Sequence, residues 1–143
     1  MSARRDHTFF TDRDLGNQFP HILASAGLKV ERHRDHFAAD CPDVEWLSAI
    51  GPSNGLPITH NSRIRYTPNE LAAVMRFGVG LLVVIGHAPY AELARPFVVT
   101  VERIQTFLDA RRPPFIAKVY RAAPTHPAGA AVLPGRIEIW HPR

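Results

Sequence analysis

Short apolar runs recur along the chain, separated by longer segments in which apolar residues return every three or four positions. Continuous apolar runs are typical of strands covered on both faces, and the second spacing is typical of helices with one buried face. The runs predict five strands, at residues 9–11, 28–32, 56–59, 79–85 and 115–120.

The periodic segments between these runs predict helices near residues 17–27, 42–51, 67–78 and 89–108. The clearest start is Thr67-Pro68-Asn69-Glu70, which has a capping residue, a proline at the first helical position and a glutamate three residues after the cap. Pro96 is expected to split or kink the last helix. Strands that alternate with helices imply right-handed crossovers. We therefore expect an α/β fold with three layers, α/β/α, around a mainly parallel sheet of about five strands.

The end of the chain differs in composition from the rest. Residues 124–134 are rich in Pro, Ala and Gly and are typical of a linker, whereas residues 136–140 can form one more strand. That strand either folds back on the domain or meets a partner, and the sequence leaves both open. We expect one domain over residues 1–123 and a tail over residues 124–143.

Length and composition indicate an ordinary globular chain. Its 143 residues are 45% hydrophobic and 21% charged, enough for one substantial core. The net charge of +4 favours an acidic partner only weakly. Cys41 is the single cysteine, so no intrachain disulfide can form, and no apolar segment is long enough to suggest a signal peptide or a membrane span. We expect a cytoplasmic protein without a membrane partner.

Acidic and amide side chains follow the first and third predicted strands. Asp12 and Asp14 come after residues 9–11, and Asn61 follows residues 56–59. Ligands bind beyond the carboxyl ends of the strands in open parallel sheets, so these side chains can face one crevice. Asp43 and Glu45, near the start of the second helix, can approach the same edge. Mg²⁺ or Mn²⁺ takes such hard oxygen ligands, and all five residues are candidate metal ligands.

Other roles are open for some of these acids. Asp43 can serve only to complement the helix dipole, and Asp14 can be a capping or surface acid. Residues two apart on a helix do not share a face, so Asp43 and Glu45 are not both expected to bind a metal directly. Of the two, Glu45 is the favoured ligand.

Arginines near these acids are candidate contacts for an RNA backbone. Arg63 and Arg65 follow Asn61, and Arg13 lies between Asp12 and Asp14. The guanidinium group matches a phosphate with two parallel donors. The alternative is a solvated positive surface, or ion pairs with the acids.

Several motifs, taken in order along the chain, resemble those of the PIN-like domains found in VapC-type toxins. They are Phe9-Phe10-Thr11-Asp12-Arg13-Asp14-Leu15-Gly16, Arg34-Asp35-His36-Phe37, Pro42-Asp43-Val44-Glu45-Trp46-Leu47, Thr59-His60-Asn61-Ser62-Arg63-Ile64-Arg65 and Pro113-Pro114-Phe115-Ile116-Ala117. The resemblance implies a metal-dependent ribonuclease of a toxin–antitoxin pair, held inactive by a cognate antitoxin and often dimeric.

The resemblance carries the catalytic positions over to Asp12, to Glu45 with Asp43 nearby, and to Asn61. The last is a departure, because the family usually has an aspartate after the third strand. Asparagine offers a carbonyl oxygen to a metal but brings no charge and cannot act as a base.

Two functions of different classes follow. The first is an endoribonuclease in which Mg²⁺ or Mn²⁺, held by Asp12, Glu45 and more weakly Asn61, activates a water to attack the RNA phosphodiester. The alternative is a catalytically degenerate PIN-like domain that binds RNA or its antitoxin without cutting. A metal-using phosphohydrolase for small substrates is a third interpretation of the same acids.

Overall fold

The computed structural model describes residues 7–53, 55–60, 67–122 and 132–142. Its strands are β1 (Thr8–Thr11), β2 (Lys29–Arg32), β3 (Leu56–Thr59), β4 (Gly80–Ile85), β5 (Phe115–Tyr120) and β6 (Arg136–His141). Its helices are α1 (Gln18–Ser25), α2 (His33–His36), α3 (Asp43–Ile50), α4 (Pro68–Arg76) and α5 (Tyr90–Ala110), with short 3₁₀ turns η1 (Arg13–Leu15) and η2 (Gly51–Ser53).

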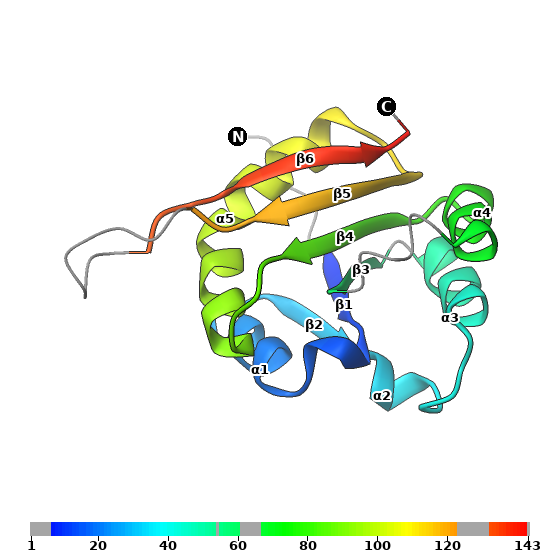
Figure 1. Ribbon diagram of the computed structural model, residues 1–143, viewed down its shortest axis with the longest axis horizontal. Helices are drawn as coiled ribbons and strands as arrows, with labels where there is room; N and C mark the ends of the chain where they lie inside the picture. The colour runs from blue at the N-terminus through cyan, green and yellow to red at the C-terminus, as the bar shows by residue number, and fades with distance from the viewer. Residues whose placement is uncertain (1–6, 54, 61–66, 123–131, 143) are drawn as a thin grey trace.

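The strands form one sheet in the order β2-β1-β3-β4-β5-β6 (Figure 1). The pairs from β2 to β5 are all parallel, as the alternation of strands and helices predicts. The carboxyl ends of these five strands therefore lie at one edge of the sheet. That edge holds the first residues after each strand, among them Asp12 and His60.

Helices cover both faces of the sheet, which confirms the three-layer α/β/α fold (Figure 1). α1 and α5 pack together on one face, where Phe97 of α5 meets the rings of Phe9 and Phe19 with centroids 5.5 and 5.6 Å apart. α3 and α4 cover the other face, where Trp46 stacks on Phe10 at 5.8 Å. Phe9 and Phe10 are adjacent in β1, so successive side chains enter opposite cores, as the pleat of a strand requires.

The end of the chain folds back on the domain. β6 pairs antiparallel with β5, with Lys118 opposite Glu138, and adds a sixth strand to the five that the apolar runs predict. Trp140 of β6 is 4% exposed and lies in the same core as Phe10 and Trp46. The sequence left open whether this strand folds back on the domain or meets a partner, and in the structure it folds back.

Two local features differ from the sequence prediction. α5 runs unbroken through Pro96, which therefore does not split the helix. A short helix, α2, follows β2 where no helix was expected. No helix among the described residues combines the length and the apolar character that crossing a membrane would need.

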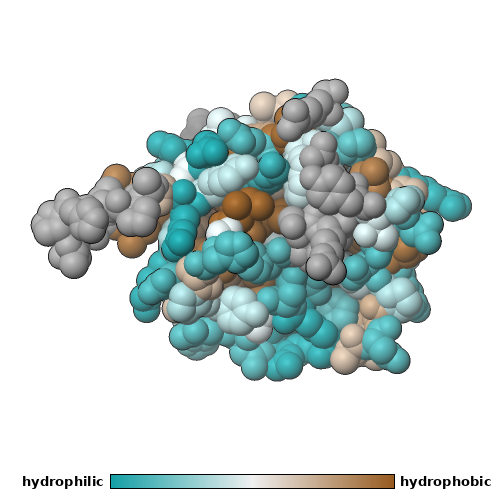
Figure 2. Space-filling model, viewed as in Figure 1, coloured by the Kyte–Doolittle hydropathy of each residue, from teal (hydrophilic) through white to brown (hydrophobic). Residues whose placement is uncertain are grey.

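On the face seen in Figure 2, most of the described surface is hydrophilic, and apolar side chains come to the surface in small patches near the central strands.

Candidate functional site

Asp12 and Asp14 lie at the carboxyl edge of the sheet because the chain turns sharply after β1. The backbone N–H of Asp12 still donates to the carbonyl of Ile58 at 3.0 Å, which extends the pairing of β1 with β3 by one residue. The side chain of Asp12 then caps η1 by accepting the N–H of Arg13 at 2.7 Å. Asp14 is the middle residue of that turn, and its side chain reaches β3.

Thr59, the last residue of β3, joins the two aspartates. Its hydroxyl oxygen lies 3.0 Å from Oδ2 of Asp12 and 2.9 Å from Oδ2 of Asp14. The N–H of His60 donates to the same oxygen of Asp14 at 3.0 Å. A hydroxyl has a single hydrogen to donate. Both contacts are therefore hydrogen bonds at once only if one carboxyl is protonated and donates to the threonine.

Burial disfavours the charged form of both carboxyls. Burial, and after it the charge of Asp12, raises the pKa of Asp14 to about 6. The pKa of Asp12 is also raised, first by burial and further by Asp43, while the hydrogen bonds from Arg13 and Thr59 lower it. Asp14 Oδ1 is buried and has no hydrogen-bond partner among the described residues. A proton or a cation near Asp14 would relieve this cost.

This arrangement fits a hard divalent cation. Mg²⁺ uses one or two carboxylates, several waters and the phosphate of a substrate, so the pair supplies the donors that it needs from the protein. Within the described residues, no three His, Cys, Asp or Glu side chains come together as a metal cluster. Asn61, the remaining expected ligand at this edge, lies outside the described residues.

The two acids of α3 have different surroundings. Asp43 accepts a hydrogen bond from Trp46 Nε1 at 2.8 Å and is one of the charges that raise the pKa of Asp12. Glu45 lies 3.7 Å from the thiol of Cys41, which donates to it. The structure thus brings the charge of Asp43 to bear on Asp12, although the sequence favoured Glu45 as the ligand.

Arg13 does not extend into solvent. Its Nε donates to His33 Nδ1 at 3.0 Å and its Nη2 donates to the carbonyl of Phe37 at 2.8 Å. The imidazole accepts at Nδ1, so its hydrogen is on Nε2, and burial lowers the pKa of His33. Arg13, predicted to bind RNA, therefore spends at least two of its donors on holding α2 against the turn that carries the aspartates.

A family model described as a PIN like domain matches residues 8–86, which is more than half of the 143-residue chain. The chain belongs to the PIN-like domain family. No curated protein and no solved structure matches it significantly. The matched span includes every candidate metal ligand, together with Arg63 and Arg65, which lie outside the described residues as Asn61 does.

Beside Asp12, the PIN-like domain has a pocket of about 50 Å³ that the sequence did not lead us to expect. Asn17, Arg32, His33 and Arg34 line it together with Asp12. Arg34 Nη1 donates to Asn17 Oδ1 at 2.6 Å, and Arg32 makes a two-bond pair with Asp35. The sequence held a signal for this pocket, because Arg32 ends β2 and Arg34 follows it, just as the aspartates follow β1.

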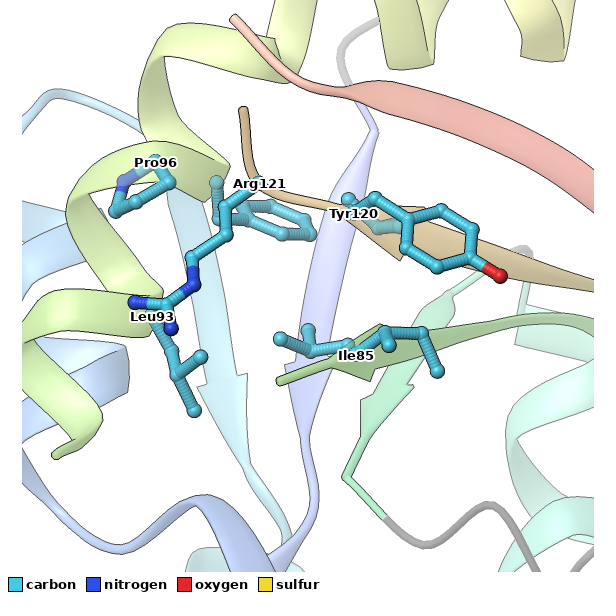
Figure 3. A pocket seen from close by; sticks show the side chains of 8 residues that line it. Ile85, Leu93, Pro96, Tyr120 and Arg121 are labelled. Carbon is cyan, nitrogen blue, oxygen red and sulfur yellow. The ribbon is translucent and has the colours of Figure 1, made fainter. Parts of the chain in front are cut away.

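The ends of β3 and β4 are tied at the same edge, since a ring nitrogen of His60 donates to the carbonyl of Gly86 at 2.7 Å. Next to them, a second pocket of about 10 Å³ lies between α5 and the ends of β4 and β5. Figure 3 shows the side chain of Arg121 extending toward Leu93 across this pocket, while the hydroxyl of Tyr120 points away. Its walls are mostly apolar and hold no carboxylate, so it offers no metal site.

Proposed function

We propose that this PIN-like domain is a metal-dependent endoribonuclease and the toxin of a toxin–antitoxin pair. Membership of a family whose members are commonly nucleases supports the reaction class. The observation that carries the proposal is the contact of Asp12 and Asp14 with one threonine hydroxyl, with a buried oxygen of Asp14 that has no hydrogen-bond partner among the described residues. The toxin role, the cognate antitoxin and a homodimer rest on the resemblance to VapC-type toxins.

In this proposal Asp12 and Asp14 hold Mg²⁺ or Mn²⁺, and Asp43, Glu45 and Asn61 are further candidate ligands. When bound, such a cation activates a water and offsets the charge that develops on a phosphodiester. The chain keeps Asp12 oriented through the N–H of Arg13 and the hydroxyl of Thr59. Because the pKa of Asp14 is raised to about 6, a proton would compete with a bound cation for this carboxyl as the pH falls toward 6. No side-chain nucleophile is needed.

A second candidate function is favoured by one residue. Asn61 stands where the resemblance leads us to expect an acid. Removing one negative charge from the site weakens its attraction for a divalent cation. A PIN-like domain that binds RNA or an antitoxin without cutting is therefore the alternative.

Cleavage of a mixed RNA by the purified protein with Mn²⁺ or Mg²⁺ tests the proposal. We expect Asp12→Ala and EDTA each to abolish cleavage, because both remove the cation from the site. The control is Asp109→Ala, which removes an exposed acid near the end of α5 and should cleave normally. If Asp12→Ala cleaved RNA as fast as the wild type, the assignment of the site to Asp12 would be wrong. RNA binding by the wild type without cleavage would favour the alternative.

The toxin role needs a separate experiment. Induced expression in a bacterial host should arrest growth with the wild type and leave growth unaffected with Asp12→Ala at the same protein level. Normal growth with an enzyme that cleaves RNA in vitro would reject the toxin role and leave the nuclease.

A further inference from the structure

We propose that the pocket between Asp12 and Arg34 binds one backbone phosphate of the substrate strand, with Arg34 as its main contact and Arg32 as a second cation. The inference rests on the proposed function and specifies where the RNA strand lies. The RNA would cross the carboxyl ends of β1 and β2, at the end of the strand order away from β5. Arg34 and Arg32 were not among the RNA-binding residues expected from the sequence.

The side chains that line the pocket favour a phosphate. The pocket has a volume of about 50 Å³, and Arg13, Arg32 and Arg34 are among the residues that line it. A guanidinium group matches a phosphate with parallel N–H donors. We therefore expect contact with the backbone, which positions a strand without reading its sequence.

Arg34 is held ready for such a ligand. Its Nη1 donates to Asn17 Oδ1 at 2.6 Å, and no other hydrogen bond of Arg34 occurs within the described part of the chain. A guanidinium has five N–H donors, so most of those of Arg34 remain for a phosphate. Because Asn17 already restrains the side chain, less conformational entropy is lost when an anion binds.

Arg32 is expected to contribute less to phosphate binding than Arg34. Its Nε and Nη2 donate to Asp35 at 2.9 and 3.0 Å, with both side chains about half exposed. The carboxylate offsets much of the charge of Arg32 but fixes its guanidinium at the rim. Together with Arg13, three arginines surround the pocket, against the carboxylates of Asp12 and Asp35. Among the residues that line the pocket, three arginines stand against the one carboxylate of Asp12, which suits a singly charged phosphodiester.

The position of the pocket favours a nucleic-acid phosphate over a carboxylate of a protein partner. Asp12 belongs both to the pocket wall and to the aspartate pair. A phosphate bound by Arg34 would therefore neighbour the phosphodiester that is cleaved, on the same strand.

Fluorescence anisotropy with a short, labelled single-stranded RNA in EDTA tests this without cleavage. We expect Arg34→Ala to weaken binding roughly tenfold, the loss of about one charge-assisted hydrogen bond. The slope of log affinity against log salt should fall by about 0.7, as for one lost phosphate contact on a single strand. Arg34→Lys should recover part of the affinity, since it keeps the charge without the planar fork.

The matched control is Arg112→Ala. Arg112 is exposed and precedes β5, at the amino edge of the parallel strands, whereas the pocket lies at their carboxyl edge. The substitution therefore removes the same charge at a place away from the pocket. Its RNA affinity should equal that of the wild type. Thermal melting of each variant should match the wild type, because Arg34 and Arg112 are both on the surface.

The outcomes separate this inference from the nuclease proposal. RNA affinity that depends on Arg34, in a protein that cleaves nothing with Mn²⁺, supports the pocket and rejects the nuclease. A wild type that cleaves RNA, with Arg34→Ala binding as tightly and with the same salt slope, overturns the pocket. So does a variant that keeps its RNA affinity but loses affinity for an oligoglutamate peptide, because the pocket then serves an acidic protein segment.

Discussion

The hydroxyl of Thr59 lies 2.9 Å from Oδ2 of Asp14 and 3.0 Å from Oδ2 of Asp12, so one hydroxyl joins the two aspartates. Burial raises the pKa of both carboxyls, and the charge of Asp12 raises the pKa of Asp14 further. The stability of the fold should therefore depend on whether this aspartate pair carries a proton, a cation or neither.

Asp14→Asn should increase stability near neutral pH. The folded pKa of about 6 lies above the unfolded value of 3.8, so the folded state binds more protons between these values. The free energy of unfolding therefore falls as the pH rises from about 4 to about 6. Above that range the buried charge of Asp14 lowers it by on the order of 2–3 kcal/mol relative to low pH. Asparagine avoids that cost. Urea unfolding of both proteins should give equal stabilities near pH 4 and a more stable variant near pH 7. A difference that does not change with pH would contradict the raised pKa.

Mn²⁺ should raise the melting temperature of the wild type, and the effect should shrink below pH 6. A ligand that binds the folded state alone stabilises it by about 2.7 kcal/mol at 100 times its Kd. Protonation of Asp14 competes with the cation, so acid weakens the effect. Differential scanning fluorimetry at several pH values measures the shift, with Asp12→Asn and Asp14→Asn expected to remove it. The same shift in Asp12→Asn would place the cation elsewhere.

Much of the fold could be predicted because its strands and most of its helices are local patterns. The five parallel strands and their order of alternation with helices follow from apolar runs and capping residues. α2 could not be predicted, because His33-Arg34-Asp35-His36 has no apolar periodicity and is held by a tertiary contact from Arg13. The split at Pro96, one of the two effects expected from this proline, does not occur for a related reason. The buried face of α5, from Leu93 through Phe97 and Ile104, outweighs the one backbone hydrogen bond that a proline removes.

The candidate site was predictable only in part. Asp12 and Asp14 follow a strand, which is enough to expect them at the carboxyl edge of a parallel sheet. The role of Thr59 depends on the register in which Thr11 pairs with Ile58, and no local pattern fixes that register. The pocket beside Asp12 likewise needs β2 next to β1. That these residues bind a metal or RNA remains a prediction.

Asp43→Asn should weaken Mn²⁺ binding more than Glu45→Gln. The charge of Asp43 acts on Asp12, whereas Glu45 accepts the thiol of Cys41. Asparagine can still accept the hydrogen bond of Trp46, so the fold should persist. Isothermal titration with Mn²⁺ should show roughly a tenfold loss for Asp43→Asn, the size typical of a removed outer-shell partner. A larger loss for Glu45→Gln would restore Glu45 as the ligand that the sequence favoured.

Arg13 and His33 should be energetically coupled. His33 is 3% exposed and accepts the Nε–H of Arg13, so His33→Ala leaves a cavity and an unsatisfied donor. We expect each alanine variant to lose stability, with a coupling energy of about 1–2 kcal/mol in a double-mutant cycle measured by urea unfolding. Strictly additive losses would mean that the hydrogen bond contributes nothing to holding α2.

The last strand should be part of the folding unit rather than an appendage. Trp140 is 4% exposed, belongs to the core on the α3 and α4 face of the sheet, and has Lys118 Nζ 4.7 Å from its ring centroid. Trp140→Ala should therefore cost about 3–5 kcal/mol, as for other buried aromatic residues. Leu133→Ala is the matched control, because Leu133 precedes the same strand but is 50% exposed and should change stability by no more than about 0.5 kcal/mol. Urea unfolding monitored by circular dichroism measures both. If the two variants were equally stable, β6 would not contribute to the core, and the domain would end with β5.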